Sequence, residues 1–138
     1  MAVGFKVKYY WYQVGHGDFL HSFFSTISHH LEPDGWGSKY PYLVKKFYSG
    51  KLDANNISKA KDEALDIKLK LAKYKPSEVI WDIEDLSKSP PWGSNISAHI
   101  TSLANYFVTS DGRDLFDVLF SAFDKALMLN VDIEIESL

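Results

Sequence analysis

The apolar residues between positions 57 and 74 recur at steps of three and four, and this spacing restricts the fold more than any other feature of the sequence. It places them on one face of a helix, while lysines and acids occupy the opposite face. The sequence therefore predicts a long amphipathic helix that begins near Asp53 or Asn55 and ends before Pro76, because proline cannot continue a helix. The apolar stripe consists of Ile57, Ala60, Ala64, Ile67, Leu71 and Tyr74.

Helical spacing also appears in three other parts of the chain. Asp18 follows a glycine-rich break and suits a helix N-terminus, so we predict a helix from there to Leu31, ended by Pro33. The segment Leu115–Leu129 is amphipathic in the same way. A shorter helix is expected over residues 42–48.

Both ends of the chain alternate apolar and polar residues, which is typical of half-buried strands. The stretch VGFKVKYYWYQV, starting at Val3, predicts one strand, and VDIEIE near the C-terminus predicts another. We expect the two strands to be neighbours, with Lys6 or Lys8 beside Asp132 or Glu134. Opposite charges on paired strands are worth roughly 0.2–1 kcal/mol each and help to set the register.

Two further strands are expected in the middle of the chain, at EVIWDI (78–83) and SLANYFVTS (102–110). Strands separated by helices predict an α+β fold, with a small mixed or antiparallel sheet and helices packed mainly on one of its faces. The length of 138 residues and the hydrophobic content of 46% fit a single domain over residues 1–138.

Composition and charge exclude several classes of function. The chain has no cysteine, and its histidines fit no ligand motif, although His16, His21 and Asp18 lie close in sequence, so we expect no metal or cofactor. The basic residues are lysines apart from Arg113, which argues against nucleic-acid binding. The chain shows neither a membrane span nor a secretory signal, so we expect a cytoplasmic protein.

The stretch VIWDIEDLSKSPPWGSN, residues 79–95, holds the candidate functional residues. On a strand, Asp82 and Glu84 would share one face, where two carboxylates could divide acid and base duties as in a hydrolase. The same acids, together with Asp85, could instead form a surface that binds another protein. A rigid loop with Pro90, Pro91 and Trp92 follows. Large rings dominate core area, which favours the core for Trp81 and Trp92, while docking on a partner stays open for Trp92.

The sequence also resembles the immunity protein 70 family of bacterial polymorphic-toxin systems. Five segments carry the resemblance in order: VGHGDFLHSFFSTISHHLE, WGSKYPYL, SGKLDANNISKAKDEALDI, VIWDIEDLSKSPPWGSNIS and SLANYFVTSDGRDLF. The resemblance implies a cytosolic α+β protein that binds and neutralises a cognate toxin, and it brings no catalytic residues with it. The C-terminal NVDIEIESL is the part that matches least.

The sequence therefore leaves three hypotheses about function. The first is a toxin antagonist whose contact surface includes Asp82, Glu84, Asp85 and the loop from Pro90 to Trp92. Many toxins that cut nucleic acids are basic, so an acidic surface bearing aromatic residues would suit a nuclease toxin. The second is a small hydrolase that uses the Asp82 and Glu84 carboxylates. The third is a structural adaptor with no toxin partner.

Overall fold

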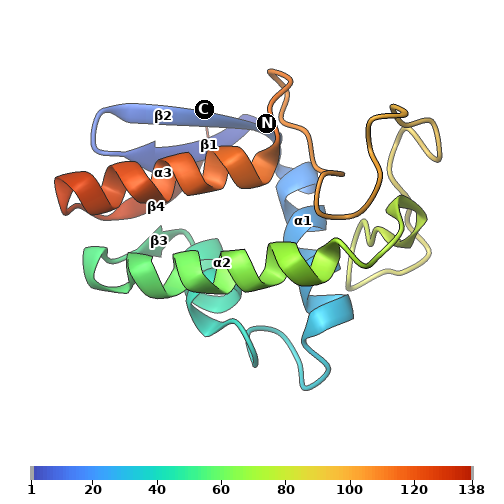
Figure 1. Cartoon of the computed structure of the whole chain (residues 1–138), viewed down its shortest axis with the longest axis horizontal. Coiled ribbons are helices and arrows are strands. Elements are labelled where there is room, and N and C mark those ends of the chain that lie inside the picture. Colours follow the sequence, from blue (N-terminus) through green and yellow to red (C-terminus); the bar gives the residue numbers. More distant parts are fainter. Residues whose placement is uncertain (1, 138) are drawn as a thin grey trace.

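The computed structural model describes residues 2–137, whose strands form one open antiparallel sheet in the order β2-β1-β4-β3. The strands are β1 (Ala2–Val7), β2 (Tyr10–His16), β3 (Lys51–Leu52) and β4 (Ile133–Ser137). Figure 1 shows the sheet at one end of the molecule, with the two termini close together beside it. The predicted α+β class is confirmed, and the sheet is the antiparallel form of the two that the sequence left open.

Three long helices supply most of the core. They are α1 (Gly17–Leu31), α2 (Ile57–Leu71) and α3 (Leu115–Leu129), and the short helical turns are η1 (Pro41–Lys46), η2 (Phe47–Ser49), η3 (Ala54–Asn56) and η4 (Pro76–Glu78). The predicted stripe of α2 is confirmed, since every member from Ile57 to Leu71 is fully buried. The expected short helix at 42–48 is present as η1, a π-helical turn, continued by η2.

The helices pack on one face of the sheet, as predicted, and Figure 1 shows α3 lying across it. Phe5 of β1 contacts Phe47, with ring centroids 5.3 Å apart, and Phe47 in turn contacts Phe123 of α3 at 5.4 Å. Lys6, the residue next to Phe5, is exposed on the opposite face. Side chains of a strand alternate between its two faces, so this pattern identifies the open face of the sheet.

The expected pairing of the first and last strands is confirmed. β1 and β4 are antiparallel neighbours, and Lys6 lies opposite Glu134 in their register. The Lys6 ammonium forms its ion pair with the adjacent acid on the same face, Glu136, at 3.9 Å. Because both side chains are exposed, this pair contributes little to stability beyond its effect on register.

The prediction of one strand over residues 3–14 is wrong, because the chain reverses at Lys8 and Tyr9 to form the β1–β2 hairpin. Lys8 adopts a left-handed conformation with φ 55°, which a two-residue hairpin turn requires. The reversal also changes the face assignment of the later residues. Trp11 pairs with Lys6 and therefore lies on the open face, where its indole ring lies against Gly4.

The two strands predicted at 78–83 and 102–110 do not form. Instead, residues 79–114 make a long irregular segment between η4 and α3 that contains turns and one isolated bridge, Val108 to Asp114. In Figure 1 this segment forms the loops at the end of the molecule away from the hairpin turn, near α1. The segment includes every residue that the sequence singled out as a site candidate.

Candidate functional site

A row of hydroxyl side chains on α1 holds the start of the irregular segment. The Ser22 hydroxyl donates to the carbonyl of Ile80 at 2.7 Å, and the backbone N–H of Ile80 donates to Thr26 Oγ1 at 3.0 Å. Further along, the N–H of Ile83 donates to Ser25 Oγ at 3.2 Å. These bonds use backbone groups that a strand would offer to a neighbouring strand, which is why EVIWDI stays irregular.

Two histidines of α1 extend the same contact at either end. His30 Nε2 lies 2.7 Å from the carbonyl of Glu78, and His21 Nε2 lies 3.2 Å from Asp82 Oδ1. The segment therefore runs back along α1 from its C-terminal end towards its N-terminal half. Asp82 and Glu84 consequently do not share the face of a strand.

Replacing Thr26 with valine tests this attachment. The change keeps the shape of the side chain but removes the acceptor for the Ile80 N–H, and a buried donor left without a partner costs about 1–3 kcal/mol of unfolding free energy. Urea unfolding would measure the loss. Thr101→Val is the matched control, because Thr101 is exposed and, within residues 2–137, its hydroxyl bonds to Asn105 alone. Equal stability of the two variants would contradict the attachment.

Of the predicted acids, Asp82 is largely engaged within the protein. Its Oδ1 accepts from the Glu84 N–H at 3.0 Å as well as facing His21, and Oδ2 lies 3.7 Å from Lys88 Nζ. The bond from the Glu84 N–H, followed by His21, holds the pKa of the Asp82 carboxyl below its usual value. Asp82 thus fixes the local chain, and its side chain is only 22% exposed.

The other two acids, Asp85 and Glu84, differ in whether their carboxylates are free to bind a partner protein. Asp85 accepts from both the hydroxyl and the N–H of Ser87, at 2.5 and 3.1 Å, and the hydroxyl bond is the main cause of its lowered pKa. Glu84 is exposed, and within residues 2–137 its carboxylate has no hydrogen bond or ion pair. Glu84 is therefore the acid best placed to meet a partner.

The loop from Pro90 to Trp92 is partly anchored. Pro90 is buried and Pro91 is exposed. The Trp92 indole N–H donates to the Tyr106 hydroxyl at 2.9 Å, and its ring meets Trp81 edge-on at 5.5 Å. Trp92 still exposes 38% of its surface, so its predicted place in the core is wrong, while Trp81 is half-buried.

A depression of about 700 Å³ adjoins this loop. It is lined by apolar residues such as Val79, Pro90 and Ile96 and by two basic residues, Lys75 and Lys88. Two lysines in the lining do not complement a basic toxin. This depression is thus less suited than the acids to the partner predicted from the sequence.

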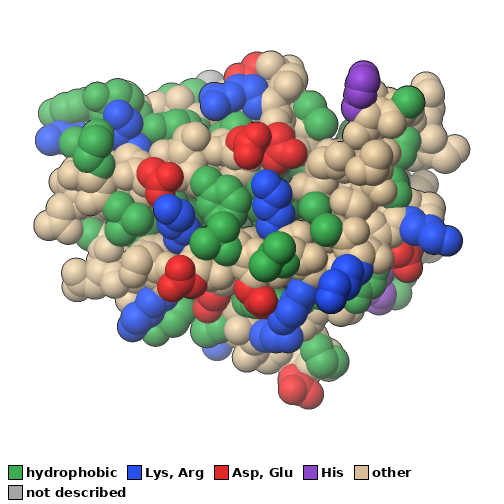
Figure 2. All heavy atoms as spheres, viewed as in Figure 1, with side chains coloured by type: hydrophobic (Ala, Val, Ile, Leu, Met, Phe, Trp, Pro, Cys, Tyr) green, Lys and Arg blue, Asp and Glu red, His purple; other side chains and the backbone are tan. Residues whose placement is uncertain are grey.

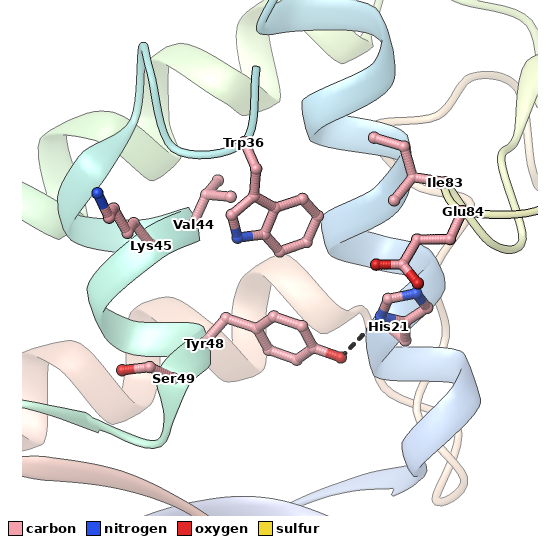
Figure 3. Close-up of a pocket in the computed structure, with 8 residues that line it drawn as sticks. All are labelled: His21, Trp36, Val44, Lys45, Tyr48, Ser49, Ile83 and Glu84. Carbon is pink, nitrogen blue, oxygen red and sulfur yellow. Dashed lines mark hydrogen bonds between the residues drawn. The ribbon is translucent and has the colours of Figure 1, made fainter.

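A second cavity, of about 350 Å³, lies beside Glu84 and contains residues that the sequence analysis missed (Figure 3). It is lined by His21, Trp36, Val44, Lys45, Tyr48, Ser49, Ile83 and Glu84. The rings of Trp36, Tyr48 and His21 form what we call the aromatic cavity. Their centroids lie 5.8 Å apart for Trp36 and Tyr48, 6.0 Å for His21 and Tyr48, and 6.5 Å for His21 and Trp36.

Hydrogen bonds fix the ring of His21 between its neighbours. An ionised carboxylate can only accept, so His21 Nε2 donates to Asp82 Oδ1 at 3.2 Å, and Nδ1 lies within hydrogen-bond distance of the Tyr48 hydroxyl, at 3.0 Å. Burial, and then the charges of Asp18 and Asp82, raises the pKa of Tyr48 to about 12. The tyrosine therefore stays protonated even well above neutral pH, and its hydroxyl can keep the contact with His21.

Trp36 reaches the cavity from the loop after α1, and Glu32 holds that loop. The Glu32 carboxylate is buried and accepts from the backbone N–H groups of Gly37, Lys39 and Tyr40 at 3.0, 3.1 and 2.9 Å. Charged hydrogen bonds of this kind are about twice as strong as neutral ones. The position of Trp36 is thus fixed although its side chain is 38% exposed.

The arrangement gives the hydrolase hypothesis no support. The strand that would place Asp82 beside Glu84 is missing, and a carboxyl group with a lowered pKa is a poor proton donor near neutral pH. His16 and His21 are also separated in role, since His16 Nδ1 accepts from the Asp18 N–H at 3.2 Å while His21 faces Asp82. Among residues 2–137, no group of three or more His, Asp or Glu side chains could hold a metal ion.

Comparison with known proteins places the chain in a family. No match was found among curated proteins or among solved structures. In the described part of the chain, no helix has the length and apolar character needed to cross a membrane. The model of the family described as immunity protein 70 matches residues 5–135 of the 138. Since this match extends over nearly the whole chain, the protein belongs to the immunity protein 70 family.

Proposed function

We propose that the protein is a non-catalytic antagonist, one domain over residues 1–138, that binds a cognate toxin in the bacterial cytoplasm and neutralises it. Membership of the immunity protein 70 family supports the immunity role in general. The proposed contact surface consists of Asp82, Glu84, Asp85, Pro90, Pro91 and Trp92. The observation that carries this choice is the exposed Glu84 carboxylate, which has no partner within the described chain, on the same segment as the half-exposed Trp92.

The members of this surface have different parts in the proposal. Glu84 supplies charge that steers a basic partner, while Asp82 and Asp85 hold the backbone and add to the field. Trp92 offers an aromatic anchor of the kind that carries much of the affinity at protein interfaces. Pro90 and Pro91 restrict the loop before binding, so less ordering entropy opposes association. A basic nuclease is the toxin class that such a surface fits.

An alternative contact surface, the face formed by α2 and α3, is less complementary in charge to a basic partner. Figure 2 shows that face, where acidic and basic side chains are interspersed. Part of this mixing comes from pairs such as Lys61 with Asp124 and Lys70 with Asp66. The face therefore behaves as an ordinary solvated surface and provides matched control positions.

Reversing the charge of Glu84 tests the proposal. We expect Glu84→Lys to weaken binding of the toxin encoded beside the gene by tenfold or more at low salt, with a smaller loss at high salt, because screening shortens the reach of the charge. Asp62→Lys, on the exposed face of α2, is the matched control and should bind as the parent does. Affinity by calorimetry and protection of toxin-expressing cells are the measurements.

Three outcomes of this experiment have different meanings. Unchanged affinity and protection by a Glu84→Lys variant with the parent melting temperature would remove Glu84 from the interface. A parent protein that neither binds nor protects against the toxin would overturn the antagonist function and leave the adaptor hypothesis. Turnover of a small substrate that is lost in Asp82→Asn would restore the hydrolase hypothesis.

A further inference from the structure

We propose that the aromatic cavity formed by His21, Trp36 and Tyr48 receives an arginine side chain of the partner toxin, with Glu84 as its counter-ion. This inference rests on the proposed function and adds the chemical identity of one anchor residue. Figure 3 shows the Trp36 and Tyr48 rings flanking the cavity, with His21 and the Glu84 carboxylate on its other side.

The ring geometry suits a planar cation. Trp36 and Tyr48 both line the cavity, and their rings are inclined by 47°, so they do not stack flat on each other. A cation within about 6 Å of a ring centroid is attracted by the ring quadrupole, most strongly by tryptophan. The third ring, His21, lies nearly parallel to Trp36, at 25°. Guanidinium can stack on such rings and donate in-plane hydrogen bonds at the same time.

The charges around the cavity favour a cation. Glu84 lines the cavity, and Asp18 and Asp82 are close enough for their charges to raise the pKa of Tyr48. Lys45 is the basic residue in the lining, and Figure 3 shows its amine directed away from the ring pair. His21 Nε2 faces the Asp82 carboxylate at 3.2 Å, so the nearest charged group to this ring is an acid.

Arginine fits better than lysine because of what the lining can accept. A carboxylate takes two parallel N–H bonds from a guanidinium, and Glu84 has both oxygens free of partners in the described chain. An ammonium would lose more hydration on entering an aromatic site. The walls are also fixed beforehand: Glu32 holds the Trp36 loop, and the Tyr48 hydroxyl bonds to His21. Little ordering is left to oppose binding.

The first test uses a small probe and no toxin. The indole N–H signal of Trp36 in NMR spectra is expected to shift on titration with N-acetyl-arginine methylamide, with millimolar affinity, and at least fivefold more weakly with the neutral citrulline analogue. In the variants, binding is followed by the backbone amide signals of residues 48 and 84, which every variant keeps. Trp36→Leu and Glu84→Gln should weaken the probe at least threefold, whereas Tyr9→Leu, at an exposed aromatic residue outside the cavity, should not. Equal binding of the citrulline analogue, or tighter binding of the lysine analogue, would overturn the assignment.

The second test uses the toxin. Trp36→Leu is expected to reduce toxin affinity tenfold or more, and Trp36→Phe, which restores an aromatic ring, should recover most of the loss. Replacing the responsible arginine of the toxin should have no further effect in the Trp36→Leu background. If Trp36→Leu retains the parent melting temperature and binds the toxin as tightly as the parent, the cavity is not an arginine site, while the antagonist function stands. If the parent itself fails to bind, the proposed function is what fails.

Discussion

Replacing Phe23 with alanine is expected to lower the free energy of unfolding by about 3–5 kcal/mol, the range for deleting a fully buried aromatic ring. Phe23 is 0% exposed and contacts three other rings edge-on: Phe24 at 5.3 Å, Phe107 at 5.2 Å and Phe116 at 5.2 Å. One of these, Phe107, belongs to the irregular segment. The ring therefore joins α1, α3 and the irregular segment, and its loss should loosen all three.

Chemical unfolding followed by circular dichroism would measure the effect of Phe23→Ala. Leu69→Ala is the matched control, because Leu69 also lies on a helix but is 73% exposed, and its truncation should change stability by less than about 0.5 kcal/mol. A loss for Phe23→Ala below about 1 kcal/mol would show that the ring does not have the packed environment described.

Replacing Glu32 with alanine should cost about 3 kcal/mol or more, because three backbone N–H groups would lose a charged acceptor in a buried position. Glu32→Gln should cost less, since the amide keeps one accepting oxygen and presents a donor where the second was. Urea unfolding would measure both variants. The effect should extend to the site, with the arginine probe binding more weakly as the Trp36 loop loses its support.

Asp34→Ala provides the control for Glu32, because Asp34 is an exposed acid in the same loop. We expect this change to leave both stability and probe binding close to those of the parent. Should Glu32→Ala and Asp34→Ala prove equally stable, the buried carboxylate would not be what holds the loop.

The spacing of apolar residues along the sequence was sufficient to predict the three long helices and the first and last strands. The apolar stripes of α2 and α3 follow from the spacing of residues close in sequence. The pairing of β1 with β4 follows from the opposite charges on the strands at the two ends of the chain. The hairpin was missed because alternation continues through the turn, and only the left-handed conformation of Lys8 marks the reversal. Propensity alone does not reveal a turn that lacks glycine, asparagine or aspartate.

The site was harder to predict because its contacts are remote in sequence. EVIWDI has strand-like composition, yet Ser22, Ser25 and Thr26 take its hydrogen bonds from more than fifty residues away. The three hydroxyl residues do share one helix face, and this polar row inside an otherwise apolar helix could have indicated a contact with the backbone of another segment. The aromatic cavity gathers side chains from positions 21, 36, 48 and 84, and no spacing rule connects them.

The attachment of the irregular segment to α1 through side chains has an evolutionary consequence. A strand in a sheet must keep its alternation and register, so few of its positions can change independently. Here the path of the backbone depends on a few fixed points, such as Ile80 bound to Thr26 and the buried Leu103 and Phe107. The exposed positions between these points can exchange charge, size and aromaticity while the frame is kept. For the proposed antagonist, such a segment would let the contact surface follow a changing toxin by substitution within one part of the chain, much as antibody loops diversify on a constant framework.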